Sequence, residues 1–321
     1  MLNCFIKEIN MLKKIIINLL LIFTVFFAIE YAAFVKTKKE NIKFQQLVKL
    51  ESNKIQNYKT RYVLMEDFSP APFRGSFINK ETNKKPVLWF GCSFAEGAGL
   101  EDNKTPCYKI SQLTRRSCLN KTKGATGVQY MYYQLSKQDF SKEVPQADFI
   151  IYTFIWNHIH RLYNYQINPL VDMFNLRYKN NNGTLEEIKP VFKPLYSSFF
   201  IRRILNKKVN KSVLREANDF ELFNLIMKET AELVKKYYPK STFIMLEFPD
   251  TSRKELPLKE IKTLESYGII VVRVKDLIGN ADIYDDKYWL PGKIHPSEQA
   301  WDIILPELVK NYMHDKYLQN E

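Results

Sequence analysis

The chain has four histidines that could serve as a general base near neutral pH: His158, His160, His295 and His314. The strongest signal for chemistry is a glycine-bearing segment, residues 91–100, with the sequence GCSFAEGAGL. It directly follows residues 86–90, a short apolar run typical of a strand that is buried on both faces. Open α/β sheets bind their ligands in loops at the carboxyl ends of strands, so Ser93 in this segment is a candidate nucleophile.

The spacing of this segment excludes three common motifs. A phosphate-binding loop ends in Gly-Lys-Ser/Thr, which is missing here, and residues 97–99 (Gly-Ala-Gly) lack the third glycine of a dinucleotide fingerprint. The nucleophile elbow Gly-x-Ser-x-Gly is excluded because Ala95 stands at its last position. A role for Ser93 must therefore be argued together with other parts of the chain.

The segment resembles the first block of the SGNH (GDSL-type) hydrolases, with Cys92 at the position where those enzymes usually have aspartate. Three further segments resemble later blocks of the family and occur in the family's order. They are Asn120, Gly127, Gln129 and Met131 for the second block, residues 155–158 (Ile-Trp-Asn-His) for the third, and residues 295–297 (His-Pro-Ser) for the fifth. The resemblance covers about residues 62 to 318.

This resemblance implies acyl transfer through a serine. Ser93 would be the nucleophile and His295 the base that accepts its proton. The backbone N–H groups of Ser93 and Ala125, with the side chain of Asn157, would hold the oxyanion of the tetrahedral intermediate. The implied architecture is a three-layer α/β/α fold around a flavodoxin-like parallel sheet.

Two positions depart from the family's pattern. Gly292 stands three residues before His295, where the family has its acid, so the carboxylate that orients the imidazole is missing or comes from Asp285 or Asp286. Loss of that acid costs a serine triad about 10⁴ in rate. Ile155 replaces the glycine of the third block, which reduces the room for substrate. A catalytically inactive glycan-binding or assembly protein therefore remains an alternative to an enzyme.

Two other groups in the chain invite different chemistry. His158 and His160 would lie on one face of an extended segment, but a zinc site needs a third protein ligand, and no cysteine or further histidine is near in sequence. We therefore expect neither a resident metal nor a cofactor. Attack by the Cys92 thiol is a further alternative, which we disfavour because its side chain should point away from that of Ser93.

Strands that alternate with helices predict a parallel sheet covered by helices on both faces. The predicted strands are residues 86–90, 147–156, 242–248 and 269–274. The predicted helices are residues 105–113, a helix capped by Asn218-Asp219 and stopped by Pro239, residues 258–267, and a last helix capped by Ser297 and bent at Pro306. Residues 165–212 break the alternation as an excursion, with a turn at residues 180–183.

Residues 15–35 are the most apolar run of the chain, and lysines flank it on both sides. At about 1.5 Å per residue, a helix of this length spans roughly 30 Å, the thickness of a bilayer core. A cleaved signal peptide and a buried soluble helix are the alternatives. We expect residues 1–35 to be a retained single-pass membrane anchor, because Glu30 and Tyr31 fit a small-residue cleavage site poorly.

The rest of the chain divides into a stalk and one domain. Residues 36–61 are rich in lysine, glutamine and asparagine and are expected to form a membrane-proximal stalk, followed by the hydrolase domain at residues 62–321. Flanking lysines favour neither orientation of the anchor, and because long domains translocate regardless of charge we place the domain outside the cytoplasm.

The net charge is +13, from 48 Lys and Arg against 35 Asp and Glu. No basic segment with interleaved aromatic residues resembles a nucleic-acid module, so we expect no nucleic-acid partner. An anionic lipid surface or an acidic glycan is the expected neighbour of this charge.

Four cysteines say little about the compartment. Cys4 precedes the apolar run, whereas Cys92, Cys107 and Cys118 lie in the domain. A continuous helix would hold Cys107 and Cys118 about 16 Å apart, too far for a disulfide, so pairing requires that the helix ends early. We expect all three to be unpaired and mostly buried.

The predicted function is that of a membrane-anchored SGNH-type serine esterase that removes O-acetyl groups from a surface carbohydrate through an acyl-Ser93 intermediate. The carbohydrate substrate follows from analogy with anchored members of the family. A polysaccharide O-acetyltransferase with the same residues is the alternative, because a sugar hydroxyl instead of water can accept the acyl group from the serine.

Overall fold

The computed structural model describes residues 18, 21, 23–29, 31, 32, 35, 76–79, 83–124, 126–137, 142, 144, 146–163, 178–187, 216–249 and 254–314. Most of the predicted anchor, the whole stalk at 36–61 and most of the excursion at 165–212 lie outside the described residues. Within the described part of the chain, no helix is both long enough and apolar enough to cross a membrane.

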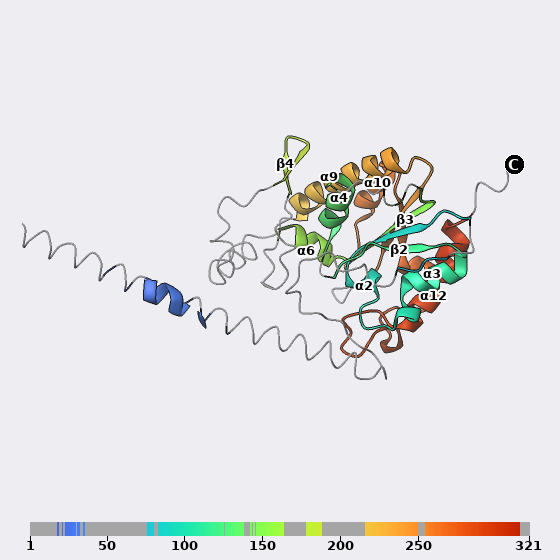
Figure 1. Ribbon diagram of the computed structural model, residues 1–321, viewed down its shortest axis with the longest axis horizontal. Helices are drawn as coiled ribbons and strands as arrows, with labels where there is room; N and C mark the ends of the chain where they lie inside the picture. The colour runs from blue at the N-terminus through green and yellow to red at the C-terminus, as the bar shows by residue number, and fades with distance from the viewer. Residues whose placement is uncertain are drawn as a thin grey trace, which may run out of the picture.

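A five-stranded parallel sheet forms the centre of the domain (Figure 1). Its strands are β1 (Val87–Phe90), β2 (Cys118–Asn120), β3 (Phe149–Phe154), β6 (Thr242–Glu247) and β7 (Ile270–Arg273). Their order across the sheet is β2-β1-β3-β6-β7, with Trp89 of β1 beside Ile151 of β3, and Ile151 beside Ile244 of β6. This is the flavodoxin-like order, so the predicted parallel α/β sheet is confirmed.

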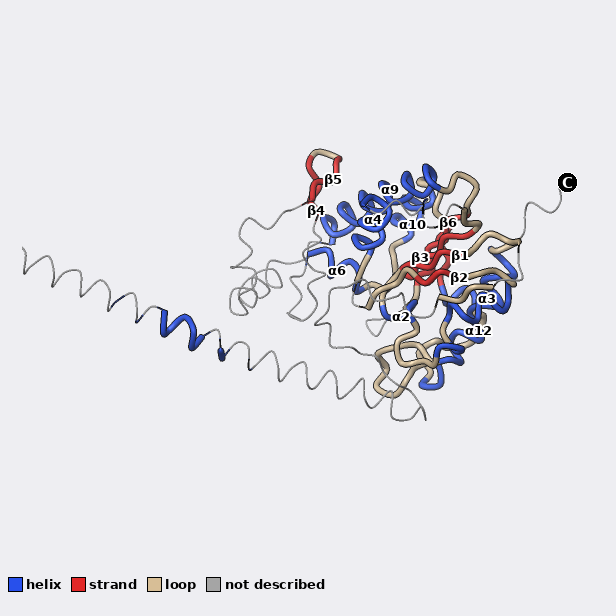
Figure 2. The backbone as a smooth tube through the Cα atoms, in the orientation of Figure 1, coloured by secondary structure: helices blue, strands red, loops and turns tan. Residues whose placement is uncertain are grey.

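Helices cover both faces of the sheet and complete three layers (Figure 2). We call one side the α12 face, which carries α2 (Ser93–Glu96), α3 (Pro106–Thr114), α11 (Val274–Leu277) and α12 (Glu298–Tyr312). We call the other the α9 face, which carries α4 (Val128–Lys137), α6 (Asn157–Tyr163), α9 (Glu216–Tyr237) and α10 (Leu258–Ser266). Two short 3₁₀ helices are η1 (Asp102–Lys104) and η3 (Asp286–Tyr288).

The central strands are buried on both faces, as their continuous apolar sequences predict. On the α12 face, Trp89 donates its indole N–H to Thr153 Oγ1 at 2.8 Å and meets the ring of Trp301 edge-on, with 6.0 Å between centroids. On the α9 face, the ring of Phe154 packs against that of Phe223, with 5.3 Å between centroids. Aromatic pairs of this kind make each face a specific core rather than a merely apolar one.

Two helix starts follow the capping residues seen in the sequence. Thr105 caps α3 by accepting a hydrogen bond from Tyr108 N at 3.4 Å, with Pro106 at the first helical position. Ser297 caps α12 in the same way, through Ala300 N at 3.4 Å.

One capping prediction needs correction. α9 begins at Glu216, so Asn218 and Asp219 lie inside its first turn and are not its cap. α12 continues through Pro306 and ends at Tyr312, and the bend expected at Pro306 stays a prediction.

The expectation that Cys107 and Cys118 are unpaired is wrong. Their sulfur atoms form a disulfide, with 5.5 Å between the two Cα atoms. The helix between them ends at Thr114, because Arg115 takes a left-handed conformation (φ 56°) and the chain turns back into β2. The cross-link fastens α3 to an edge strand, whereas Cys92 is a buried free thiol, as predicted.

A two-stranded hairpin, β4 (Tyr178–Asn181) and β5 (Thr184–Glu187), is the described part of the excursion. The predicted turn is confirmed: Gly183 has φ 85° and donates its N–H to Asn180 Oδ1 at 2.8 Å. The ring of Tyr178 meets that of Tyr132 of α4 edge-on at 5.0 Å. The hairpin therefore packs on the α9 face, away from the α12 face.

Candidate active site

Ser93 is the first residue of α2, directly after the carboxyl end of β1. The turn between strand and helix depends on Gly91, which has φ 144° and leaves no space for a side chain: a Cβ there would lie 3.0 Å from Ala95 Cβ and 3.1 Å from Thr153 O. After this turn the Cys92 side chain is buried in the core of the α12 face, and Ser93 is partly exposed.

Ser93 Oγ and His295 Nε2 lie 3.0 Å apart although 202 residues separate them in the sequence. Ser93 follows β1, and His295 lies in the loop that leads into α12. A hydroxyl and an imidazole at this distance can exchange a proton directly. The structure thus brings together the two residues predicted as nucleophile and base.

The loop that carries His295 folds back on itself between η3 and α12. Leu290 N donates to His295 O at 2.9 Å, and Trp289 forms an isolated antiparallel bridge with Pro296. The imidazole lies edge-on to the ring of Phe94 of α2, with 5.8 Å between centroids, and His295 is 4% exposed. These contacts hold the imidazole against the helix that carries the serine.

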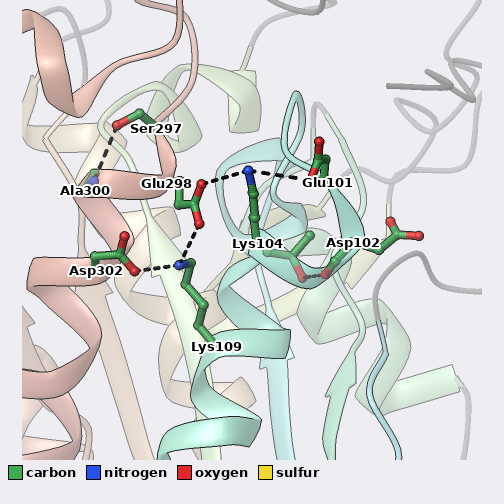
Figure 3. Close-up of polar contacts among 9 residues, drawn as sticks. Glu101, Asp102, Lys104, Lys109, Ser297, Glu298, Ala300 and Asp302 are labelled. Atoms are coloured by element: carbon green, nitrogen blue, oxygen red, sulfur yellow. Dashed lines mark hydrogen bonds and ion pairs between the residues drawn. The ribbon is translucent and has the colours of Figure 1, made fainter. Parts of the chain in front are cut away.

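An ion-pair network fastens α12 to the segment that follows α2 (Figure 3). Glu298, in the first turn of α12, pairs with Lys104 of η1 at 3.2 Å and with Lys109 of α3 at 3.3 Å. Lys109 also pairs with Asp302 at 2.5 Å. The hydrogen bond and charge of Glu298 raise the pKa of Lys104. Because Glu298 follows His295 by three residues, the network also restrains the loop that carries His295.

Asp285 and Asp286, the two carboxylates predicted as possible partners of His295, each form an ion pair with a lysine. Asp285 accepts a hydrogen bond from Lys287 N at 3.2 Å and pairs with Lys287 Nζ at 3.4 Å. The backbone hydrogen bond from Lys287 lowers the pKa of Asp285. Asp286 forms an ion pair with Lys293 Nζ. The sequence could not show these lysine partners, because they depend on how the loop folds.

The residues predicted to hold an oxyanion are only partly described. Asn157 is exposed at the start of α6, directly after β3, and β3 is the neighbour of β1, so Asn157 and Ser93 follow adjacent strands. Ala125 lies outside the described residues. Its neighbour Gly124, which the sequence analysis did not single out, lies beside the nucleophile: a Cβ built on it would be 3.9 Å from Ser93 Cβ.

The loop that contains Gly124 is anchored on the turn before the serine. Lys123 N donates to Gly91 O at 3.2 Å, and Thr126 Oγ1 donates to the same oxygen at 3.1 Å. Burial lowers the pKa of Lys123, and the charge of Glu96 acts in the opposite direction. Gly124 could have been found from the sequence, because it is a glycine in a loop that follows a strand. Nothing in the sequence indicated that Glu96 would lie near this loop.

The histidines considered as metal ligands are arranged differently from the expectation. Residues 157–163 form helix α6, so the extended segment on which the metal-site alternative rested is not present. His158 is buried, with Nδ1 2.7 Å from the Tyr152 hydroxyl. Among the residues that the structure describes, no group of three or more His, Cys, Asp or Glu side chains is placed to hold a metal ion.

No family model and no curated protein matches the chain. It is similar to the solved structure of a member of the lipolytic protein G-D-S-L family from Veillonella parvula, at 12% identity and a TM-score of 0.40, over 72% of this chain and 99% of that one. It is also similar to an acetyl xylan esterase from the rumen bacterium Butyrivibrio proteoclasticus, at 11% identity and a TM-score of 0.44, over 71% of this chain and 63% of that one.

Proposed function

We propose that the protein is a serine ester hydrolase of the SGNH type. The observation that carries this proposal is the 3.0 Å contact between Ser93 Oγ and His295 Nε2 at the carboxyl edge of the sheet. In the first step Ser93 Oγ attacks the ester carbonyl carbon and His295 Nε2 accepts the hydroxyl proton. The imidazolium then gives this proton to the departing alkoxide oxygen as its bond to the carbonyl carbon breaks, which releases the alcohol and leaves the acyl-serine. Water attacks the acyl-serine in the same way, which releases the acid and restores the enzyme.

The tetrahedral intermediate places a negative charge on the former carbonyl oxygen. We assign its stabilisation to the backbone N–H groups of Ser93 and of residues 124–125, together with the Asn157 amide. The position of Gly124 beside Ser93 and the origin of Asn157 on the adjacent strand support this assignment. One oxyanion donor of this kind is worth about 3–4 kcal/mol in acyl transfer.

The substrate we propose is an O-acetyl group on a surface carbohydrate. A small acyl group is supported by the confinement of the base, which lies against Phe94 and is 4% exposed. Ile155, at the position of the family's third-block glycine, is buried at the end of β3 and adds bulk there. The net charge of +13 favours an acidic polymer over a neutral one as the carrier of the ester.

The location we propose is a single-pass anchor at residues 1–35 with the domain outside the cytoplasm. The Cys107–Cys118 disulfide supports this compartment, because disulfides persist in oxidising environments and are rare in the cytosol. Among the described residues of the N-terminal stretch, Phe23, Val25 and Phe27 are 58%, 57% and 67% exposed. Apolar side chains exposed to this extent are expected on a segment that faces lipid.

Labelling with a fluorophosphonate probe tests the proposed nucleophile. The purified protein should be labelled, and Ser93→Ala should abolish the labelling, because the probe reacts with an activated serine. Ser266→Ala is the matched control, since Ser266 is an exposed serine at the end of α10 and should leave labelling intact. Folded protein that is not labelled would instead support an inactive glycan-binding protein.

A product assay tests the hydrolase against the transferase. With an acetyl ester and water alone, a hydrolase should release acetate at a rate that added glycan does not increase. Acetylated glycan formed at the expense of acetate would show that a sugar hydroxyl resolves the acyl-serine, and the protein would then be an O-acetyltransferase.

A further inference from the structure

Helix α6 begins just after β3 ends, and Asn157 is its first residue, at the carboxyl end of the strand next to β1. The corner between β3 and α6 is closed by two backbone hydrogen bonds, from His158 N to Ile155 O at 2.9 Å and from Ile159 N to Trp156 O at 3.0 Å. Asn157 is exposed, whereas the next residue, His158, is completely buried. The direction of the Asn157 amide therefore depends on how α6 is fixed to the sheet.

A buried pair of side chains fixes the first turn of α6 to β3. The Tyr152 hydroxyl lies 2.7 Å from His158 Nδ1, and both side chains are fully buried. Burial lowers the pKa of His158 and raises the pKa of Tyr152, so both groups are neutral near pH 7. The ring of Phe154 lies edge-on to the imidazole at 5.8 Å. The pair connects strand and helix across the corner that carries Asn157.

Arg161, on the next turn of α6, reaches the loop after β2. Its Nη1 donates to Thr126 O, and Gln129 Nε2 donates in the other direction to Arg161 O at 3.4 Å. Thr126 is bonded in turn to Gly91 O, in the turn before the serine. Arg161 thus joins α6 to the loop that places Gly124 beside the nucleophile.

These bonds form a continuous series through the parts of the chain to which we assign oxyanion donors. The series runs from Tyr152 to His158, along α6 to Arg161, and on to Thr126 and Gly91. It passes the corner that bears Asn157, the loop after β2 and the turn before α2. A shift in any one of these bonds changes the distances between donors that must meet on a single oxygen atom.

We propose that His158 and Arg161 are positioning residues that hold the Asn157 amide and the loop after β2 at the spacing an oxyanion requires. This inference rests on the proposed ester hydrolase function. His158 acts through Asn157, its neighbour on α6, and Arg161 acts through Thr126. Oxyanion donors must lie within a few tenths of an ångström of their productive positions, so loss of this support lowers the rate of the chemical step while leaving ester binding nearly intact.

Two substitutions remove these bonds while they retain most of the side-chain volume. Tyr152→Phe deletes the hydroxyl that holds His158, and Arg161→Met deletes the donor to Thr126 O. Each should lower kcat for p-nitrophenyl acetate by about 10- to 100-fold with KM within about threefold, as expected for misplaced groups outside the reacting atoms. Arg161→Lys retains a donor and should recover part of the lost kcat.

The matched control is Thr230→Val in α9. It deletes a buried side-chain hydrogen bond within one helix, from Thr230 Oγ1 to Ile226 O at 2.6 Å, which is not part of the series above, and should leave kcat unchanged. Urea unfolding of every variant shows whether it is folded. If Tyr152→Phe does not fold, Arg161→Met compared with Arg161→Lys provides the same test.

A double-mutant cycle distinguishes positioning from a merely structural role. In an Asn157→Ala background the amide is already gone, so Tyr152→Phe should cause little further loss of kcat. Full additivity, or an active wild type whose kcat is unchanged by Tyr152→Phe and Arg161→Met, would overturn this inference alone. A wild type that neither hydrolyses esters nor reacts with fluorophosphonate would overturn the proposed function, and the inference with it.

Discussion

The two faces of the sheet are held together by different means. On the α12 face, a disulfide joins α3 to β2, and the ion pairs of Glu298 and Asp302 with lysines join α12 to the segment after α2. On the α9 face, buried ionisable groups lie at the carboxyl ends of the strands: His158 after β3 and Glu247 at the end of β6. Burial raises the pKa of Glu247 and lowers the pKa of His158, so we expect the α9 face to make stability depend on pH.

The same contrast separates two imidazoles at one edge of the sheet. His295 on the α12 face and His158 on the α9 face each lie within hydrogen-bond distance of a hydroxyl. The partner of His295 is Ser93, which is partly exposed, whereas the partner of His158 is Tyr152, which is sealed in the core. The two pairs therefore differ in the exposure of the hydroxyl and not in the pairing itself, and a substrate could reach only the hydroxyl of Ser93.

The largest expected effect is the loss of activity in His295→Ala. Without the base the serine hydroxyl is not activated, and kcat for ester hydrolysis should fall by about 10⁴ or more. His314→Ala is the matched control, because His314 is an exposed histidine beyond the end of α12 and should retain full activity. Activity within tenfold of wild type in His295→Ala would show that the α12 face does not carry the reactive imidazole.

Glu247 should make the stability of the α9 face depend on pH. It is 5% exposed, its Oε1 accepts from Leu256 N at 2.6 Å, and burial raises its pKa from 4.5 to about 7. A carboxyl whose folded pKa is raised stabilises the fold fully below pH 4.5, and this contribution is lost as the pH rises to 7. The difference amounts to roughly 3 kcal/mol.

Glu247→Gln tests this expectation, since the amide keeps an acceptor for Leu256 N but does not ionise. In urea unfolding between pH 4.5 and 8, wild type should lose roughly 3 kcal/mol relative to the variant as the pH rises. Glu307→Gln, at a partly exposed glutamate of α12, should follow the wild-type curve. Parallel curves for wild type and Glu247→Gln would place the pH sensitivity elsewhere.

Removal of the disulfide should destabilise the α12 face by a similar or slightly smaller amount. For a sequence separation of 11 residues, the loop-entropy relation gives about 2 to 3 kcal/mol for the Cys107→Ser/Cys118→Ser variant. Unlike the effect of Glu247, this loss should be the same at pH 5 and pH 8. Unfolding of wild type with and without reductant gives the same comparison, and an identical midpoint in both conditions would contradict it.

Much of the candidate site could be predicted because its signals are local. The apolar run at β1 and the glycines around Ser93 predict a strand followed by a turn, and the small number of histidines makes His295 easy to find. The capping residues Thr105 and Ser297 follow from equally local patterns.

The features that could not be predicted depend on tertiary structure. β2 has only three residues, Cys118–Asn120, too few to show a periodic pattern. The disulfide depends on the end of α3 at Arg115, a left-handed residue that neither glycine nor proline announces. Likewise, only the folded loop shows that lysines hold Asp285 and Asp286.

The smallest expected effect concerns the ion pairs of Glu298. Its side chain is 36% exposed, so water screens its pairs with Lys104 and Lys109, and Glu298→Gln should cost at most about 1 kcal/mol in unfolding free energy. Glu307→Gln is the matched control on the same helix, because Glu307 is 39% exposed and pairs with a single lysine, Lys310.

Salt should separate the ion pairs of Glu298 from the disulfide on the same face. At about 1 M salt the Debye length falls to about 3 Å, so the cost of Glu298→Gln should vanish while the cost of removing the disulfide remains. Urea unfolding at low and high salt measures both. A loss above about 2 kcal/mol that persists at high salt would mean that the Glu298 ion pairs behave as buried ion pairs. Both faces would then depend on buried charged groups, and the contrast between them would not hold.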